Sequence, residues 1–359
     1  MVWSVSFSLK PRRHSMYTLV IPPFDEHAAQ AAQQRLDALA KLPRSLGKLE
    51  ELAVRLAGIT GQACPCFAHK RLVLFAGDHD IALHGLSFTG QEVTAMQVRN
   101  FIQGGGTINA FCRTAHADVQ IVDVGVKEDL SQLEGLVHCN VMHAAHDFSQ
   151  GAAMSREQAI ACINVGISMA KQAYAEGCTL LAAGEMGIGN TSPSAAVIAV
   201  LTGAPVAAIA GMGSGIAAPM IERKVACICQ GIALNKPNPA DPIDILAKVG
   251  GTELGAMAGL MLGGAALRIP VVVDGFIAGA AAALAVALQP AARAMLVGSH
   301  NSAELGHQII MQHLAIPTYL DLGMRLGEGT GAVLLFPIID SAVRILHEMN
   351  TRKGIGLSC

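Results

Sequence analysis

Residues 179–191 read TLLAAGEMGIGNT, an apolar run followed by a turn that places Glu185 among three glycines. The run 179–183 is typical of a strand buried on both faces, as in a parallel sheet. The turn leads into the segment 192–201, whose composition predicts a helix. Strand, turn and helix together predict an α/β fold, with backbone N–H groups of the turn placed to hold an anion.

A second glutamate has the same setting. Residues 323–331 read GMRLGEGTG, with Glu328 between two glycines, and they follow the apolar run 318–322. Because glycine has no Cβ, the backbone can approach a ligand on which the neighbouring carboxylate acts. Open α/β sheets bind ligands at the carboxyl ends of their strands. We therefore predict one site that contains both Glu185 and Glu328.

The rest of the chain alternates between short apolar segments and longer amphipathic ones. This alternation predicts a doubly wound, mostly parallel, Rossmann-like sheet with helices on both faces. Strands are predicted at 72–76, 119–124, 179–183, 205–210, 271–274, 294–298 and 318–322. Helices are predicted at 26–40, 46–59, 92–103, 155–176, 192–201, 221–234, 253–267, 276–288, 303–314 and around 342–349.

Three parts are expected along the chain. Residues 1–24 form an extension that we expect to be disordered. Residues 25–66 carry two amphipathic helices without a strand between them, and we expect them to pair with residues 340–359 as a small helical subdomain. Residues 67–339 form the α/β catalytic domain.

Composition and charge exclude several classes of protein. An apolar content of 52% with 14% charged residues argues against disorder. Twenty-five basic and 27 acidic residues leave a formal charge of −2 without a Lys/Arg block, so we expect no nucleic-acid partner. Nine scattered cysteines without a recognisable secretory signal predict reduced thiols in the cytoplasm. The apolar stretch 277–288 is too short to span a bilayer, so a buried helix and no membrane partner are expected.

Two motifs extend the predicted site. Asp78 and His79 end the first strong strand, where Asp78 either shapes a pocket or caps a turn. Residues 211–215 read GMGSG and repeat the glycine turn after the predicted strand 205–210. Two such turns favour a phosphate-bearing ligand, although neither matches a Walker A loop or a full dinucleotide fingerprint.

Two other motifs are weaker. The HAAHD run at 143–147 has metal-ligand residue types, but its context predicts a surface loop. The run 299–307 begins with Ser299 and His300, and a Ser-His-acid triad stays open there. No G-x-S-x-G elbow marks a nucleophile, however.

Six motifs in order carry a family resemblance. They are RSLGKLE (44–50), AGDH (76–79), GEMGIGNT (184–191), VDGFI (273–277), SHNSAELGH (299–307) and LDLGMRLGEGTGA (320–332). Over about residues 25–345 the chain thus resembles the nicotinate-nucleotide:dimethylbenzimidazole phosphoribosyltransferase family. The resemblance implies a Rossmann-like sheet with a small helical domain, assembled as a homodimer.

The resemblance also implies the reaction. Phosphoribose would move from nicotinate mononucleotide to 5,6-dimethylbenzimidazole or a related base, giving α-ribazole 5′-phosphate and nicotinate for the nucleotide loop of cobalamin. The cationic pyridinium ring becomes neutral as nicotinate departs, so neither a metal nor a cofactor is expected. In the family the glutamate of the last motif is the general base, which corresponds to Glu328, and the earlier motif glutamate corresponds to Glu185.

The residues expected to act follow from these motifs. Glu328 and Glu185 are the catalytic candidates, and the lysine after the second glycine turn corresponds to Lys224. The substrate-binding candidates are Asp78, His79, Ser87, Gln97, Gly187, Gly189, Asn190, Thr191, Gly213, Ser214, Lys224, Asp274 and Gly327.

The sequence departs from the family pattern in two loops. Asp80-Ile81 and His84-Gly85 stand where the family has Gly-Val and Glu-Gly, in the loop that helps to form the base pocket. In the second glycine turn, Met212 and Ser214 replace the usual Arg and Thr.

Other interpretations of the same residues stay open. An NAD(P)-dependent oxidoreductase would use the glycine turns with a fuller fingerprint, and a non-catalytic nucleotide-binding module would not need Glu328. Glu328 could instead interact with a helix dipole, and Glu185 could only order the 187–191 turn.

Overall fold

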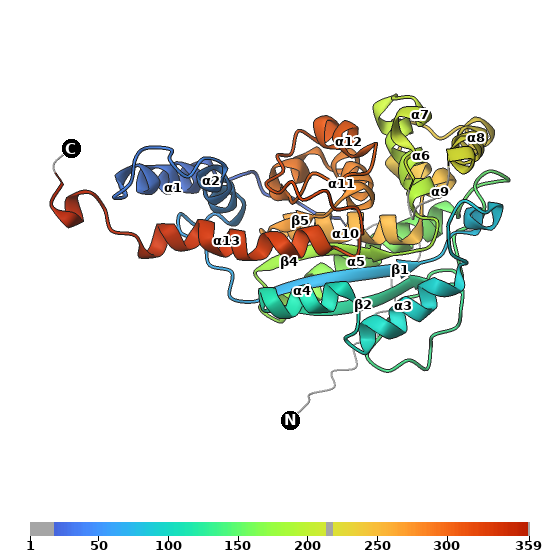
Figure 1. The fold of residues 1–359 in the computed structure, drawn as a ribbon, viewed down its shortest axis with the longest axis horizontal. Coiled ribbons are helices and arrows are strands. Elements are labelled where there is room, and N and C mark those ends of the chain that lie inside the picture. Colours follow the sequence, from blue (N-terminus) through green and yellow to red (C-terminus); the bar gives the residue numbers. More distant parts are fainter. Residues whose placement is uncertain (1–17, 213–217, 358–359) are drawn as a thin grey trace.

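The computed structural model describes residues 18–212 and 218–357, and a six-stranded sheet forms its centre (Figure 1). The strand order is β3-β2-β1-β4-β5-β6, and every neighbouring pair is parallel. The strands are β1 (Lys70–Gly77), β2 (Ala117–Gly125), β3 (Val137–His138), β4 (Leu180–Met186), β5 (Val271–Val273) and β6 (Leu296–Gly298). This topology confirms the predicted doubly wound, Rossmann-like α/β fold.

Strand order reverses between β1 and β4. The chain adds β2 and β3 on one side of β1, then crosses the sheet to add β4, β5 and β6 on the other. Loops from the carboxyl ends of β1 and β4 therefore diverge and leave a crevice between them. β1 is buried along its whole length, because helices cover both faces of the sheet.

Helices form a layer on each face (Figure 1). α4 and α13 lie on one face, and α5, α10 and α11 lie on the other. The helices are α1 (Glu26–Ala38), α2 (Lys48–Thr60), α3 (Glu92–Ile102), α4 (Thr107–Ala115), α5 (Arg156–Ala175), α6 (Thr191–Thr202), α7 (Val206–Ile209), α8 (Ala218–Asn235), α9 (Pro242–Val249), α10 (Thr252–Ala266), α11 (Phe276–Leu288), α12 (His307–Leu314) and α13 (Thr330–Glu348). Short 3-10 turns occupy Asp80–His84, Pro290–Met295 and Lys353–Ile355.

Small residues allow α5 and α10 to pack backbone against backbone. A Cβ added at Gly166 would lie 1.8 Å from the carbonyl oxygen of Ala256, and one at Gly259 would lie 1.9 Å from that of Ile163. Neither position accepts a side chain unless a helix moves. The abundance of Ala and Gly in the sequence is therefore used for close packing of layers.

α1, α2 and the second half of α13 form a helical arm at one end of the molecule (Figure 1). Arg35 donates hydrogen bonds to the carbonyls of Leu346 and Met349 at 3.1 and 2.8 Å, which joins the two ends of the chain. Leu39 and Thr351 add an isolated antiparallel bridge. The boundaries of a separate helical subdomain stay a prediction.

The expected N-terminal extension, residues 1–24, lies only in part within the described residues. Residues 1–17 lie outside the described residues. Residues 18–25 form neither a helix nor a strand, and Leu19, Ile21 and Phe24 pack against the core.

Two predicted strands are wrong. The segment 205–210 instead holds the short helix α7, which begins after Pro205. Proline has no N–H for a ladder, and its fixed φ suits a helix start. The segment 318–322 makes only one parallel bridge, between His300 and Leu320. Its residues are partly or fully exposed, so they lack the layer on each face that a buried strand needs.

Besides α7 and the 3-10 turns, two helices and one strand were not predicted from the sequence. α4 and α9 are short helices, and β3 contains only two residues. α4 begins where the side chain of Asn109 accepts a hydrogen bond from the backbone of Gly106 at 3.0 Å. Asp241 caps α9 by accepting from the backbone N–H groups of Ile243 and Asp244. Such caps stabilise short helices. The amphipathic pattern of α4 and α9 covers too few residues to predict a helix from the sequence.

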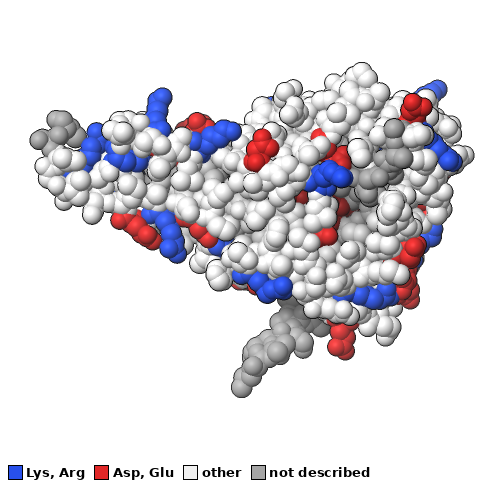
Figure 2. Space-filling view, in the orientation of Figure 1, with Lys and Arg blue, Asp and Glu red and all other residues white. Residues whose placement is uncertain are grey.

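By length and composition, α13 could cross a membrane. No other helix among the described residues meets both criteria. The apolar window of α13 is 56% buried inside the fold, so it serves as a core helix. α11 covers the apolar stretch predicted to be buried, and most of its side chains are buried. Acidic and basic side chains are interspersed on the face drawn in Figure 2, most of which is uncharged.

Candidate active site

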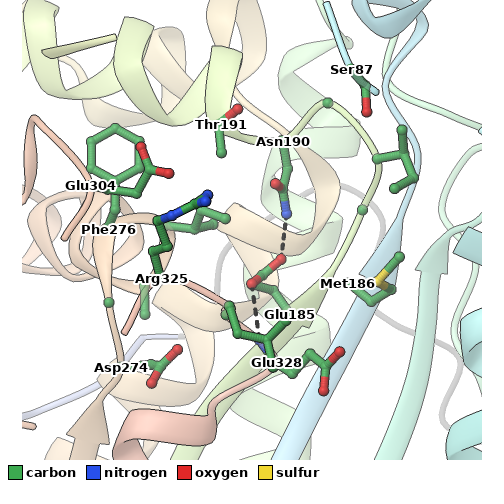
Figure 3. A pocket seen from close by; sticks show the side chains of 18 of the residues that line it. Ser87, Glu185, Met186, Asn190, Thr191, Asp274, Phe276, Glu304, Arg325 and Glu328 are labelled. Atoms are coloured by element: carbon green, nitrogen blue, oxygen red, sulfur yellow. Dashed lines mark hydrogen bonds between the residues drawn. The ribbon is translucent and has the colours of Figure 1, made fainter. Parts of the chain in front are cut away.

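A cavity of about 240 Å³ opens at the carboxyl edge of the sheet (Figure 3). Its walls come from the loop and helix after β1, the turn after β4 and the segments after β5 and β6. The glycine run at residues 323–331 completes them. The lining residues are Leu86, Ser87, Val93, Gln97, Glu185, Met186, Gly187, Ile188, Gly189, Asn190, Thr191, Asp274, Gly275, Phe276, Ile277, Ala278, Ser302, Glu304, Arg325, Leu326, Gly327 and Glu328. The cavity therefore lies where the strand order reverses.

The turn from β4 to α6 forms one wall. A Cβ at Gly187 would lie 2.2 Å from the carbonyl oxygen of Gly77, so only glycine fits against the end of β1. The backbone N–H of Ile188 donates to Thr94 Oγ1 at 3.1 Å, which ties the turn to α3. α6 begins at Thr191, so the positive end of its dipole borders the cavity.

Glu185 is buried near the carboxyl end of β4 and holds the cavity floor together. The side-chain amide of Asn190 donates to its Oε2 (Figure 3), and the backbone N–H of Glu328 donates to its Oε1 at 3.2 Å. Burial raises the pKa of Glu185 to about 8, with smaller contributions from Asp274 and Glu253, against the two hydrogen bonds. Glu185 is consequently protonated near neutral pH.

Glu328 has a strained backbone and a buried carboxyl group. Its φ is +61°, between Gly327 at +88° and Gly329 at +79°, which is uncommon for a residue with a Cβ. Burial raises its pKa and Asp274 adds to this, whereas a hydrogen bond from the backbone of Ile108 lowers it. Oε2 is buried and accepts no hydrogen bond from any described residue. This oxygen is therefore available to accept a proton from a bound ligand.

Asp274 closes the floor behind the two glutamates. It is 4% exposed, and its Oδ1 accepts a hydrogen bond from the backbone of Ala332 at 2.9 Å. His300 Nδ1 lies 3.8 Å from the same oxygen. Burial raises the pKa of Asp274, although His300 and three backbone donors oppose the rise.

Two basic side chains, Lys224 and Arg325, mark one end of the cavity, which we call the cationic end although the carboxylate of Glu304 lies beside Arg325 (Figure 3). Lys224 of α8 is buried, and its Nζ donates to Thr191 Oγ1 at 2.7 Å and to the carbonyl of Gly211 at 3.3 Å. Burial lowers the pKa of Lys224 to about 8, and Glu304 raises it slightly. Arg325 extends over the same end of the cavity, where Figure 3 draws it between Thr191 and Asp274. Arg325 and a helix N-terminus thus border a space suited to an anion, and Lys224 lies behind Thr191 at the same end.

The opposite end of the cavity is largely apolar. Leu86, Val93, Met186 and Ile188 line it, with Ser87 and Gln97 as polar groups. Apolar walls with a few polar side chains are typical of a pocket for a planar aromatic molecule.

The structure brings most of the predicted site residues together. Ser87, Gln97, Glu185, Gly187, Gly189, Asn190, Thr191, Asp274, Gly327 and Glu328 line the cavity. Lys224 lies directly behind Thr191. Gly213 and Ser214 lie outside the described residues.

Asp78 and His79 lie beneath the cavity rather than in its lining. Asp78 Oδ2 accepts a hydrogen bond from the backbone of Lys127 at 2.9 Å. His79 Nε2 lies 3.0 Å from Glu253 Oε1, and both side chains are buried. The virtual Cβ of Gly187 would lie 3.3 Å from His79 Nε2. In this structure both residues support the loop and the turn that form the cavity.

Sequence reasoning missed twelve of the 22 lining residues as site residues, among them four with aromatic or polar side chains: Phe276, Ser302, Glu304 and Arg325. Each of these four lies in a run quoted above for its glycines or its family resemblance. Their position in these runs could therefore have identified them, because residues next to a glycine turn at a strand end lie at the same edge of the sheet as the turn itself.

The weaker motifs lie away from the cavity. His143 and His146 occupy the loop between β3 and α5, as predicted. Among the residues that the structure describes, no group of three or more His, Cys, Asp or Glu side chains is placed to hold a metal. Ser299 Oγ lies 3.0 Å from His300 Nδ1, but both residues are buried and do not line the cavity.

Comparisons with known proteins show the family of the chain. The family model DBI_PRT, described as a phosphoribosyltransferase, matches residues 21–356. A relative from Geobacter sp. (strain M21), named nicotinate-nucleotide–dimethylbenzimidazole phosphoribosyltransferase, is 47% identical over 94% of this chain and 97% of its own length. A relative of the same name from Chloroflexus aurantiacus is 48% identical over 94% and 96%. The crystal structure of CobT from Thermus thermophilus matches with a TM-score of 0.89 and 41% identity, over 92% of this chain and 99% of that chain.

Proposed function

The chain belongs to the family of nicotinate-nucleotide–dimethylbenzimidazole phosphoribosyltransferases, and we propose that it moves 5-phosphoribose from nicotinate mononucleotide to a benzimidazole nitrogen. The products are α-ribazole 5′-phosphate and nicotinate, which serve the assembly of the cobalamin nucleotide loop. The redox enzyme and the non-catalytic module have no counterpart among the relatives named above.

The observation that carries this proposal is the position of Glu328. Its buried Oε2, without a partner among the described residues, borders a cavity with a cationic end and an apolar end. The cationic end suits the phosphate of a nucleotide, and the apolar end suits an aromatic base. The carboxylate between them can therefore act where the two substrates meet.

The cationic end suits the 5′-phosphate. The start of α6, Lys224 and Arg325 supply positive potential there. Charge-assisted hydrogen bonds to phosphate are stronger than neutral ones. We infer that this end orients the ribose so that C1′ faces the base.

The transfer itself needs one proton acceptor. As the bond from C1′ to the pyridinium nitrogen breaks, its electron pair stays on that nitrogen and nicotinate leaves as a neutral ring. The lone pair of one benzimidazole nitrogen forms the new bond to C1′, and the base becomes cationic. The proton on the other ring nitrogen then passes to Glu328. General-base help of this kind is worth about 10²–10⁴-fold in rate.

Glu185 has a different role in this proposal. Because burial keeps it protonated near neutral pH, it is a poor base there. Its oxygens accept hydrogen bonds from Asn190 and from the backbone of Glu328. Glu185 thus orders the glycine turn and fixes Glu328 at the same time.

We propose a homodimer that acts in the cytoplasm. Large apolar side chains flank the cavity mouth at Leu83, Phe88, Met96 and Leu326, each more than half exposed. Each of them either lines the cavity or lies within three residues of a lining residue. A second copy of the chain seated on this rim would cover these side chains and shield the reaction from water.

The test is to incubate the enzyme with nicotinate mononucleotide and 5,6-dimethylbenzimidazole and to separate the products by chromatography. Nicotinate and α-ribazole 5′-phosphate should appear in equal amounts, and neither should appear without the base. Hydride transfer with NADH, followed by absorbance, is the control for the redox alternative. Absence of nicotinate release with any benzimidazole would exclude the proposed reaction.

A further inference from the structure

The loop after β1 supplies two residues of the apolar end, Leu86 and Ser87. It begins with the 3-10 turn Asp80–His84, and Gly85 in the left-handed conformation ends that turn. Leu86 is buried although its neighbours are not. The position of this loop therefore determines the shape of the apolar end.

His84 attaches the end of this turn to a separate loop that follows β3. Its Nε2 lies 2.7 Å from Asp147 Oδ2 and 3.3 Å from Ser149 Oγ. Because a carboxylate only accepts, His84 Nε2 carries the proton. Ser149 donates its hydroxyl to Asp147 Oδ1 at 2.7 Å and its backbone N–H to the same oxygen at 3.0 Å. Both oxygens of Asp147 are thus engaged, and its orientation is fixed.

The electrostatic setting supports the contact. Burial alone would raise the pKa of Asp147, but hydrogen bonds from Ser149 and His84 hold it below its ordinary value. Asp147 is therefore charged at neutral pH. The side chains of His84 and Asp147 are 29% and 19% exposed, so solvent screens the pair only in part.

The same contact reaches the opposite end of the cavity. Gln230 of α8 donates to the carbonyl of Ser149 at 3.0 Å. α8 also carries Lys224, which donates to Thr191 in the cavity. The loop with His84 and the helix behind the cationic end are thus anchored to one segment.

We propose that His84, held by Asp147 and Ser149, is a positioning residue that sets the base specificity of the cavity. The proposal rests on the proposed function, because it assigns the apolar end to the benzimidazole. His84 does not line the cavity, so it acts only through the placement of Leu86 and Ser87. A small displacement of Leu86 loosens packing on the aromatic ring but leaves the contacts to phosphate in place.

The test compares H84A, H84Q and D147N with the parent enzyme. For H84A and D147N, KM for 5,6-dimethylbenzimidazole should rise by about 10-fold, which corresponds to about 1.4 kcal/mol. KM for nicotinate mononucleotide and kcat should stay within about twofold. H84Q retains a side-chain N–H donor and should recover most of the affinity. R156A, which removes the exposed ion pair of Arg156 with Asp241, is the matched control and should change neither KM.

A double variant separates one shared contact from two independent effects. H84A/D147N should raise KM for the base no more than the larger single change, because both remove the same contact. Unchanged KM for the base in H84A and D147N, with or without a lower Tm, would overturn the proposal, as would fully additive effects. Calorimetric titration with 5,6-dimethylbenzimidazole alone gives the same comparison without turnover. An inactive parent enzyme would therefore count against the proposed function and leave the role of His84 measurable.

Discussion

Two glutamates in similar glycine runs acquire different chemistry from their surroundings. Burial, helped by nearby acids, raises the pKa of Glu185 although two hydrogen-bond donors oppose the rise, whereas Glu328 retains a buried oxygen without a partner among the described residues. The sequence placed both residues at one sheet edge. It could not separate their roles, because these depend on burial and on contacts between segments more than 140 positions apart, as from Glu185 to the backbone of Glu328.

Replacing Glu185 with Gln should change how stability depends on pH. The folded-state pKa of about 8 lies above the ordinary 4.5, so the folded state binds an extra proton between those values. This stability is fully present below about pH 4.5 and is lost as pH rises through about 8, by about 1.4 kcal/mol per pH unit. Urea unfolding from pH 5 to 9 should therefore show E185Q gaining stability relative to the parent. Parallel curves would mean that the Glu185 pKa is ordinary.

Replacing Lys224 with Met should weaken nucleotide binding. Charged hydrogen bonds contribute about 1.5–3 kcal/mol, so Kd for nicotinate mononucleotide should rise by about 10–100-fold. In the parent enzyme affinity should fall above about pH 8, where Lys224 loses its proton and Glu185 loses its own. In the Lys224→Met variant, affinity should still fall above about pH 8, but only by the amount that the ionisation of Glu185 causes. Calorimetric titration with nicotinate mononucleotide at pH 7 and pH 9 measures both effects. Lys171→Met, at an exposed position, is the control. Equal Kd values for Lys224→Met and the parent enzyme would show that Lys224 does not contribute to the site.

At the scale of elements, glycine turns and strand ends explain why the site forms where it does. The turn after β4 was predictable because an apolar strand, glycines and a helix follow one another. The glycine run at residues 323–331 was correctly predicted to lie at this edge of the sheet. The prediction relied on a strand at 318–322, however, and that segment is not a strand. A single bridge between His300 and Leu320 still holds that segment beside β6. Local pattern cannot distinguish such a segment from a strand, because the difference is whether other layers cover it.

Gly187→Ala should damage the site more than the fold. The added Cβ would lie 2.2 Å from the carbonyl oxygen of Gly77, so the turn must move away from β1. We expect kcat/KM to fall by at least about 10-fold, with a stability loss of about 1–3 kcal/mol. Gly151→Ala is the matched control, because a Cβ there meets no atom within 4 Å. Activity near that of the parent in Gly187→Ala would show that the turn does not set the cavity.

At the scale of the whole molecule, the proposed homodimer would cover the exposed apolar side chains around the cavity. The homodimer is predicted from the sequence only through the family resemblance, because the exposure of a side chain cannot be read from composition. Phe88, for example, is 79% exposed and lies beside a residue that lines the cavity.

Light scattering tests the assembly. The parent enzyme should have twice the 37.2 kDa mass of one chain. Phe88→Asp places a charge on the rim and should shift the population toward single chains with lower turnover. A parent of single-chain mass at micromolar concentration would contradict the dimer.

The account as a whole depends on Glu328 as the base, and its replacement with Gln is the most direct test. The carboxylate also meets the start of α4 through the backbone of Ile108, so a helix-dipole role is the competing explanation. Nicotinate release should fall by about 10²-fold or more in kcat, while Kd for nicotinate mononucleotide stays within a few-fold. Near-normal turnover, with a stability loss of about 0.3–1 kcal/mol, would contradict the catalytic role of Glu328.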